Sequence, residues 1–115
     1  MTLKITNTET NGTSIVTLDG RIVIGDEGDA LRDRLKNLLA EGKKQIVVNM
    51  ELIKCVDSAG LGTLFAAHLS AKAKGASLKL CNLGSRFQEV LQTTRLATEF
   101  QVCNTEAAAV KSFTH

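Results

Sequence analysis

Hydrophobic residues recur along the chain with two periods, and the shorter one predicts strands. Residues 77–81 alternate leucines with Ser77 and Lys79, as half-buried strands do. The uninterrupted Ile-Val-Val run at residues 46–48 is typical of a strand buried on both faces. Asn-Gly and Asp-Gly pairs mark turns between the first segments. The predicted strands are residues 3–5, 14–18, 46–48, 77–81 and a short 101–103, while residues 21–25 either continue the second strand or form the loop after it.

The longer period predicts helices between these strands. The first helix carries one apolar stripe of four leucines, Leu31, Leu35, Leu38 and Leu39. A second helix follows residue 58, and Gly42 and Gly75 are expected to end these two helices. Ser85 and Gln88 have the spacing of a capping box, which predicts a third helix with Ser85 as its N-cap. Asn104 is the expected cap of a final helix.

The alternation of strands and helices predicts an α/β fold. A length of 115 residues fits a single domain spanning residues 1–115. We expect a mixed, mostly parallel sheet of four to five strands packed with about four helices. In such folds the loops at the carboxyl ends of the strands gather at one edge, where function usually lies. The turn at 57–58 should therefore meet the loops at 20–26 and 82–85.

Composition narrows the class of partner. The net charge is +2, lysines and arginines are dispersed, and aromatic residues make up 3% with no Trp or Tyr. A nucleic-acid surface needs clustered positive charge or stacking side chains, so no direct nucleic-acid binding is expected. The N-terminus lacks the apolar region of a signal peptide, and no apolar run reaches transmembrane length. We expect a cytoplasmic protein that does not contact a membrane.

The cysteines and histidines do not suggest a cofactor. Cys55, Cys81 and Cys103 show no Cys-x-x-Cys spacing, so we interpret them as free thiols in a reducing compartment. His68 and His115 have no ligand-like spacing to them, so neither a metal site nor another cofactor is expected.

The stretch Val56 to Leu64, VDSAGLGTL, places Gly60 and Gly62 at the start of the second helix. Glycine in a helix interior costs about 1 kcal/mol relative to alanine. Two glycines beside an Asp-Ser pair therefore suggest that something comes close to this backbone.

Enzyme motifs are incomplete in this stretch. A nucleophile elbow, G-x-S-x-G, would have glycine where Val56 stands, and His68 lies too far along the same helix to serve Ser58. A dinucleotide motif, G-x-G-x-x-G, would end in glycine where Phe65 stands, and no phosphate-binding P-loop sequence exists. We expect no catalytic residue in this chain.

Ser58 has a simpler interpretation. At a helix N-terminus its hydroxyl could cap the helix by accepting a hydrogen bond from the N–H of Gly60 or Leu61. Small neighbours would leave the hydroxyl open to a phosphorylating enzyme, and helix N–H groups tolerate a phosphate there. Leu61 is either an exposed anchor for a partner or a core residue.

These residues resemble the STAS domain, as found in bacterial anti-sigma factor antagonists. The resemblance rests on Asp57-Ser58-Ala59-Gly60-Leu61-Gly62 and extends to residues 18–22, 46–50, 96–100 and 106–110. It implies a STAS-type fold and a binding protein rather than an enzyme.

The resemblance also implies a mechanism. The unmodified antagonist binds an anti-sigma factor that is a serine kinase, and this releases a sigma factor. The kinase phosphorylates the serine that matches Ser58, the antagonist dissociates, and a serine phosphatase resets it. The predicted partner-binding residues are Arg21, Ile22, Asp26, Asp57, Ser58, Ala59, Gly60 and Leu61.

Two positions depart from the family pattern. Asn49 stands where the family often has aspartate, which removes a charge near the expected site, and Arg95 stands where a glycine is common. Two other functions stay open. The chain could be a fixed STAS subunit of a lipid-transport or stress-signalling assembly, or a module that binds a small ligand such as a nucleotide or anion.

Overall fold

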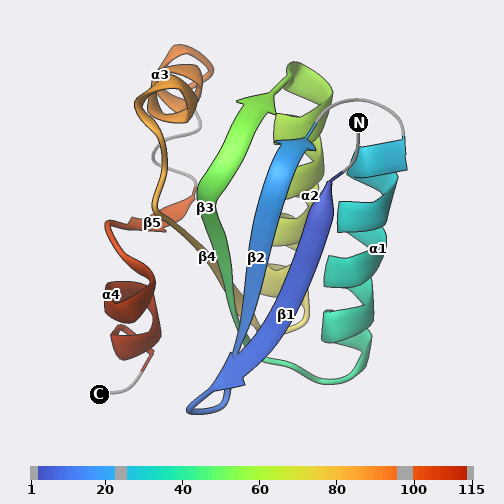
Figure 1. Ribbon diagram of the computed structural model, residues 1–115. Helices are drawn as coiled ribbons and strands as arrows, with labels where there is room; N and C mark the ends of the chain where they lie inside the picture. Colours follow the sequence, from blue (N-terminus) through green and yellow to red (C-terminus); the bar gives the residue numbers. More distant parts are fainter. Residues whose placement is uncertain (1–2, 23–25, 96–99, 114–115) are drawn as a thin grey trace.

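One five-stranded sheet in the order β1-β2-β3-β4-β5 carries the fold (Figure 1). The computed structural model describes residues 3–22, 26–95 and 100–113, with the backbone alone at residues 26–28 and 86. The strands are β1 (Lys4–Thr10), β2 (Thr13–Ile22), β3 (Gln45–Val56), β4 (Ser77–Cys81) and β5 (Gln101–Cys103). The helices are α1 (Asp26–Ala40), α2 (Ser58–Ala73), α3 (Ser85–Thr93) and α4 (Glu106–Lys111). The predicted order of elements and the α/β class are confirmed.

The sheet is mixed because its first two strands form a hairpin. β1 and β2 pair antiparallel, whereas every later neighbouring pair is parallel. Asn11 and Gly12 connect the hairpin with φ values of 52° and 78°. Two consecutive positive φ values are the signature of a tight hairpin turn, which is why Asn-Gly predicts this connection.

The larger core lies between the sheet and the helices α1 and α2, which Figure 1 shows side by side on one face. The leucine stripe of α1 is buried here as predicted, and Phe87 and Leu91 of α3 extend the same cluster. The strands contribute alternate residues, among them Val16 and Leu18 of β2 and Ile46 of β3. This aliphatic packing holds α1 and α2 against the same face of the sheet.

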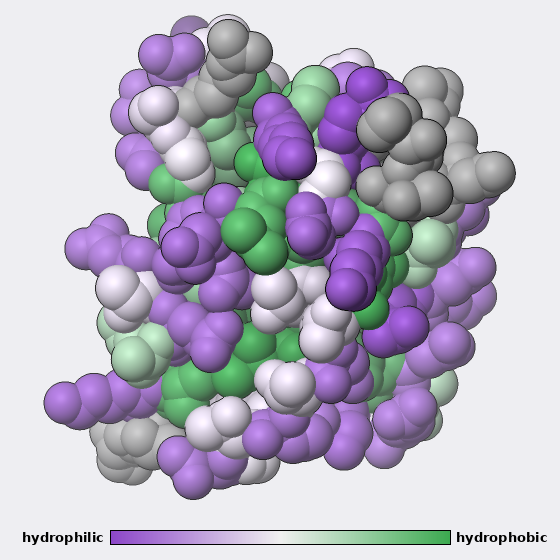
Figure 2. All heavy atoms as spheres, in the orientation of Figure 1, coloured by the Kyte–Doolittle hydropathy of each residue, from purple (hydrophilic) through white to green (hydrophobic). Residues whose placement is uncertain are grey.

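The opposite face is covered mainly by α4. A second cluster there contains Ile15, Val47, Cys81, Ala109 and Val110. Polar side chains predominate over the rest of this face (Figure 2), as expected for an antiparallel hairpin that faces water on one side.

β3 is longer than the hydrophobic pattern predicts. The apolar run ends at Val48, yet the strand continues to Val56 because β2 pairs with it up to the contact between Ile22 and Val56. Two register shifts between β2 and β3 accommodate this extension. Its partner on the other side, β4, pairs no further than Asn49 with Cys81.

Two predicted helix caps are wrong by one residue. The N-cap of α3 is Gly84, with no side-chain hydrogen bond, and Ser85 is the first helical residue. Instead of completing a capping box, Gln88 donates its side-chain N–H to the Leu83 carbonyl at 3.2 Å. α4 is capped by Thr105 rather than Asn104, because the Thr105 hydroxyl accepts from the Ala108 N–H at 3.0 Å.

Candidate functional site

The turn between β3 and α2 is built on Asp57. Its backbone is extended, with φ −94° and ψ −178°, and its Oδ1 accepts a hydrogen bond from the Gly60 N–H at 2.7 Å. Asp57 is therefore the N-cap of α2, and the prediction that Ser58 caps the helix is wrong. Ser58 is the first helical residue and is exposed. Its hydroxyl is not needed for the cap, so Ser58→Ala should not weaken the start of the helix.

The carbonyl of Ile22, at the end of β2, holds this turn in place. It accepts a hydrogen bond from the Asp57 N–H at 3.2 Å. A Cβ added to Gly60 would lie 2.0 Å from the same carbonyl oxygen. The prediction that something comes close to this backbone is correct for Gly60, and the approaching group belongs to the chain itself.

Gly62 and Leu61 have different roles. A Cβ at Gly62 would meet nothing within 4 Å, and the residue is exposed, so this glycine leaves space beside the helix start. Leu61 is 4% exposed and belongs to the larger core. Of the two alternatives for Leu61, the structure supports the core residue and contradicts the exposed anchor.

The other predicted partner-binding residues are either exposed, buried or without a described side chain. Arg21 and Ile22 lie beside Cys55 and Val56 in the sheet register, which brings the end of β2 to the turn. Arg21 and Ala59 are exposed, whereas Ile22 is fully buried and acts through its backbone. Asp26 begins α1, and its side chain lies outside the described part of the structure.

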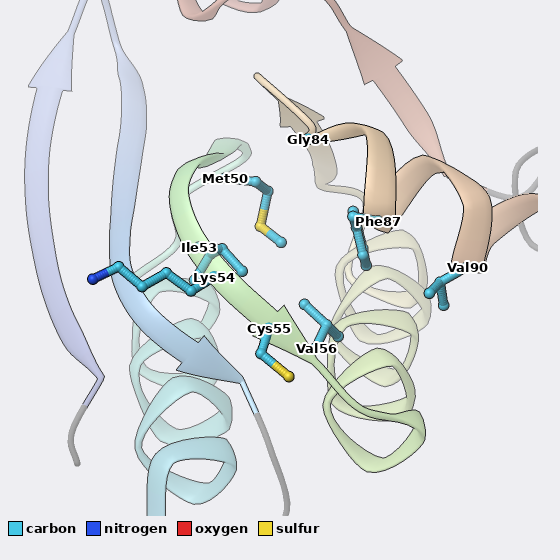
Figure 3. A pocket seen from close by; sticks show the side chains of 8 residues that line it. All are labelled: Met50, Ile53, Lys54, Cys55, Val56, Gly84, Phe87 and Val90. Atoms are coloured by element: carbon cyan, nitrogen blue, oxygen red, sulfur yellow. The ribbon is translucent and has the colours of Figure 1, made fainter.

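A small cleft lies next to the turn, and no feature of the sequence predicts it. Its volume is about 160 Å³, and it separates the carboxyl half of β3 from α3. Figure 3 shows Ile53 and Val56 of β3 facing Phe87 and Val90 of α3 across it. The cleft forms because β3 extends past the end of β4 and α3 packs beside the extension.

The two positions that depart from the family pattern both have local explanations. Asn49 is buried, donates to Glu106 Oε1 at 2.9 Å and accepts from the Glu51 N–H at 2.9 Å. It joins β3 to α4 and so has a structural role. Arg95 follows the C-cap of α3 with φ 62°, a conformation that favours glycine. Leu96, in the matching segment, lies outside the described residues.

The histidine nearest to Ser58 in the sequence is not its neighbour in space. His68 is 8% exposed and packs against Phe65 and Phe100, with ring-centroid distances of 6.3 Å and 5.5 Å. It lies ten residues along α2 from Ser58, about 15 Å at the rise of an α-helix. In the part of the chain that the structure describes, no three His, Cys, Asp or Glu side chains come together as a metal site requires. None of the described helices is both long and apolar enough to span a membrane.

The sequence model of the STAS domain matches residues 4–109. The chain belongs to the STAS domain family. BtrV of Bordetella bronchiseptica, provisionally named as an anti-sigma factor antagonist, is 24% identical over 111 residues, covering 96% of this chain and 95% of BtrV.

Solved structures share the STAS fold at low sequence identity. An anti-sigma factor antagonist from Mycobacterium paratuberculosis matches with a TM-score of 0.83 and 19% identity over 96% of this chain and 92% of that one. The Bacillus cell fate determinant SpoIIAA in its phosphorylated form matches with a TM-score of 0.74 and 20% identity, over 96% and 99% of the two chains. SpoIIAA in its unphosphorylated form matches with a TM-score of 0.75 and 18% identity over 96% and 97%. The STAS fold thus covers nearly all of this chain.

Proposed function

We propose that this STAS domain is an anti-sigma factor antagonist that is switched off by phosphorylation of Ser58. Unmodified, it binds an anti-sigma factor serine kinase, which then releases its sigma factor. The kinase transfers the γ-phosphoryl group of ATP to Ser58 Oγ, and the antagonist dissociates. A serine phosphatase hydrolyses the phosphoserine and restores binding. The chemistry belongs to these partners, so the domain itself acts in the cytoplasm as a binding protein without catalytic residues.

The single observation that carries this proposal is the exposure of Ser58 on a hydrogen-bonded turn. Asp57 performs the capping, so the neighbouring hydroxyl is exposed and its removal or modification does not undo the helix start. The Ile22 carbonyl fixes the turn from the other side. Relatives point the same way, because BtrV carries the name of an antagonist and SpoIIAA has been solved with and without phosphate.

Charge explains how phosphorylation would act as a switch. A phosphoserine carries about −1.5 to −2 charges at neutral pH. In the free domain the N–H groups of the first helical turn compensate part of it. A partner surface that receives a neutral hydroxyl beside the Asp57 carboxylate would instead bury two adjacent negative groups. Unpaired buried charges cost several kcal/mol in an interface, which corresponds to a loss of affinity of at least a hundredfold.

The proposal is tested with the cognate kinase and ATP. Fragment mass spectrometry should place one phosphate on Ser58 in the wild type and in Thr63→Ala, and none on Ser58→Ala. Thr63 is the matched control because its hydroxyl lies on the same helix and donates to the Ala59 carbonyl at 3.1 Å. Kinase affinity should be high for Ser58→Ala and at least tenfold lower for Ser58→Asp, with unchanged circular dichroism. Phosphate on another residue, or equal affinities, would contradict the proposal and favour a fixed assembly subunit.

The cleft beside the turn does not favour the ligand-binding alternative. Small-molecule pockets usually have volumes of roughly 300–1,000 Å³. A cleft of about 160 Å³ is too small for a nucleotide. Nucleotide binding by the isolated domain, measured by calorimetry, would nevertheless revive that alternative.

A further inference from the structure

Two of the three cysteines lie side by side on neighbouring strands. Cys81 ends β4 and Cys103 ends β5, and the parallel register pairs them directly. Residues paired in this way project to the same face, and both belong to or pack against the cluster under α4. Neighbouring strands are about 4.8 Å apart, within the Cα separation of roughly 4.4–6.8 Å that a disulfide bridges.

We propose that Cys81 and Cys103 form a redox-sensitive pair, which closes to an intramolecular disulfide when the protein meets a peroxide and reopens with thiol reductants. Cys55 is exposed, lines the cleft between β3 and α3, and takes no part in this pair. The inference concerns the opposite face of the sheet from the larger core and does not depend on the function of Ser58.

The position of β5 makes closure feasible. Disulfides require Cβ atoms about 3.5–4.5 Å apart, slightly less than the spacing of parallel strands. β4 is held on both sides, by β3 and by β5, whereas β5 has three residues and pairs with β4 alone among the described strands. A small inward shift of β5 therefore brings the two sulfur atoms together. The bond would carry some strain, and strained disulfides are reduced more readily.

The environments of the two thiols set the order of reaction. Cys81 is completely buried, and its burial, with the nearby negative charge of Glu106, raises the pKa of its thiol to about 12. Cys103 is half-buried and can be reached from solvent. Since the thiolate is the nucleophile and Cys103 is the accessible thiol, Cys103 should react with peroxide first.

Oxidation of the pair to a disulfide takes two chemical steps. The Cys103 thiolate attacks one oxygen of hydrogen peroxide, an S–O bond forms, the O–O bond breaks and hydroxide leaves, giving a sulfenic acid. The Cys81 sulfur then attacks the Cys103 sulfur, the S–S bond forms, and the sulfenic hydroxyl leaves with the Cys81 proton as water. In total, two thiols are oxidised and one peroxide is reduced to two waters.

The experiment uses the full chain with Cys55→Ser, so that only the proposed pair remains. After exposure to hydrogen peroxide, the intact mass should fall by two hydrogens, and tryptic mapping should find the Cys81 and Cys103 peptides joined. Dithiothreitol should restore the mass. The disulfide closes a loop that contains α3, so the oxidised form should melt at a higher temperature than the reduced form.

The control is Cys55→Ser combined with Cys103→Ala, a change at a half-buried edge position that only borders the cluster under α4. This variant should neither lose two hydrogens nor gain thermal stability. Three results would overturn the proposal: no reaction at Cys103, stable addition of oxygen to Cys103 while Cys81 stays reduced, or disulfide-linked dimers in place of the internal bond.

Discussion

Replacing Gly60 with alanine tests whether the close approach between α2 and the end of β2 holds the candidate site together. The new Cβ would lie 2.0 Å from the Ile22 oxygen and 2.8 Å from its carbonyl carbon. Ordinary contact begins at 3.4 Å, so the two segments would have to separate by about 1.4 Å, the difference between these distances. Both groups are backbone and cannot turn away as a side chain could.

Three contributions determine the change in the free energy of unfolding of Gly60→Ala. Overpacking of this kind costs about 1–3 kcal/mol, and losing the hydrogen bond from the Asp57 N–H to the Ile22 carbonyl adds about 1 kcal/mol. The better helix propensity of alanine offsets about 1 kcal/mol of this loss of stability. We expect the free energy of unfolding to fall by about 1–3 kcal/mol, a sizeable part of the roughly 5–15 kcal/mol that stabilises a typical domain.

Urea denaturation followed by far-ultraviolet circular dichroism measures this loss as a lower midpoint at unchanged slope. Gly62→Ala is the matched control, because it makes the same change two residues later in open space. It should be neutral or stabilise by up to about 1 kcal/mol. If Gly60→Ala were as stable as the wild type, or Gly62→Ala were equally destabilised, the steric reasoning would be refuted.

Two further substitutions test the contacts around Asp57 and Asn49. Asp57→Ala should lower the free energy of unfolding by about 0.5–2 kcal/mol through loss of the N-cap, whereas Asp57→Asn should keep most of it; equal losses in urea titrations would argue against the cap. Asn49→Asp should place a carboxylate against Glu106 Oε1. Repulsion raises the folded-state pKa of this pair above its unfolded value, so the variant should be least destabilised in acid and lose stability as the pH rises through that pKa. Adding Glu106→Gln should remove the pH dependence, and a pH-independent loss in the single variant would contradict this reasoning.

The fold was predictable because its pattern is local. The leucine stripe of α1 and the Ile46-Val48 run identify a buried helix and a buried strand from their spacing alone, and their alternation indicates a parallel sheet. The second half of β3 was not predictable in this way. Its residues are partly polar, and it is a strand only because β2 continues beside it to Ile22.

The turn at residues 57–58 was placed correctly between β3 and α2, but its details were misread. Asp57 and Ser58 are both good N-cap residues, and the sequence cannot choose between neighbours because the choice depends on where β3 ends. The two glycines looked alike in sequence, although the Ile22 carbonyl distinguishes them in space. Leu61 was ambiguous for the same reason, since the direction of its side chain follows from the cap that starts α2.

The Ile22 carbonyl contacts both Asp57 and Gly60, so the shape of the turn at Ser58 depends on strand pairing. The turn that presents Ser58 has its contacts only where β2 lies beside β3, because the Asp57 N–H and the Gly60 backbone both meet a residue more than thirty positions earlier in the chain. A newly made or damaged copy that lacks this pairing has the same amino-acid sequence at Ser58 but not the same shape. Under the proposed function, a kinase that recognises this shape would modify folded copies and leave copies without the strand pairing unmodified.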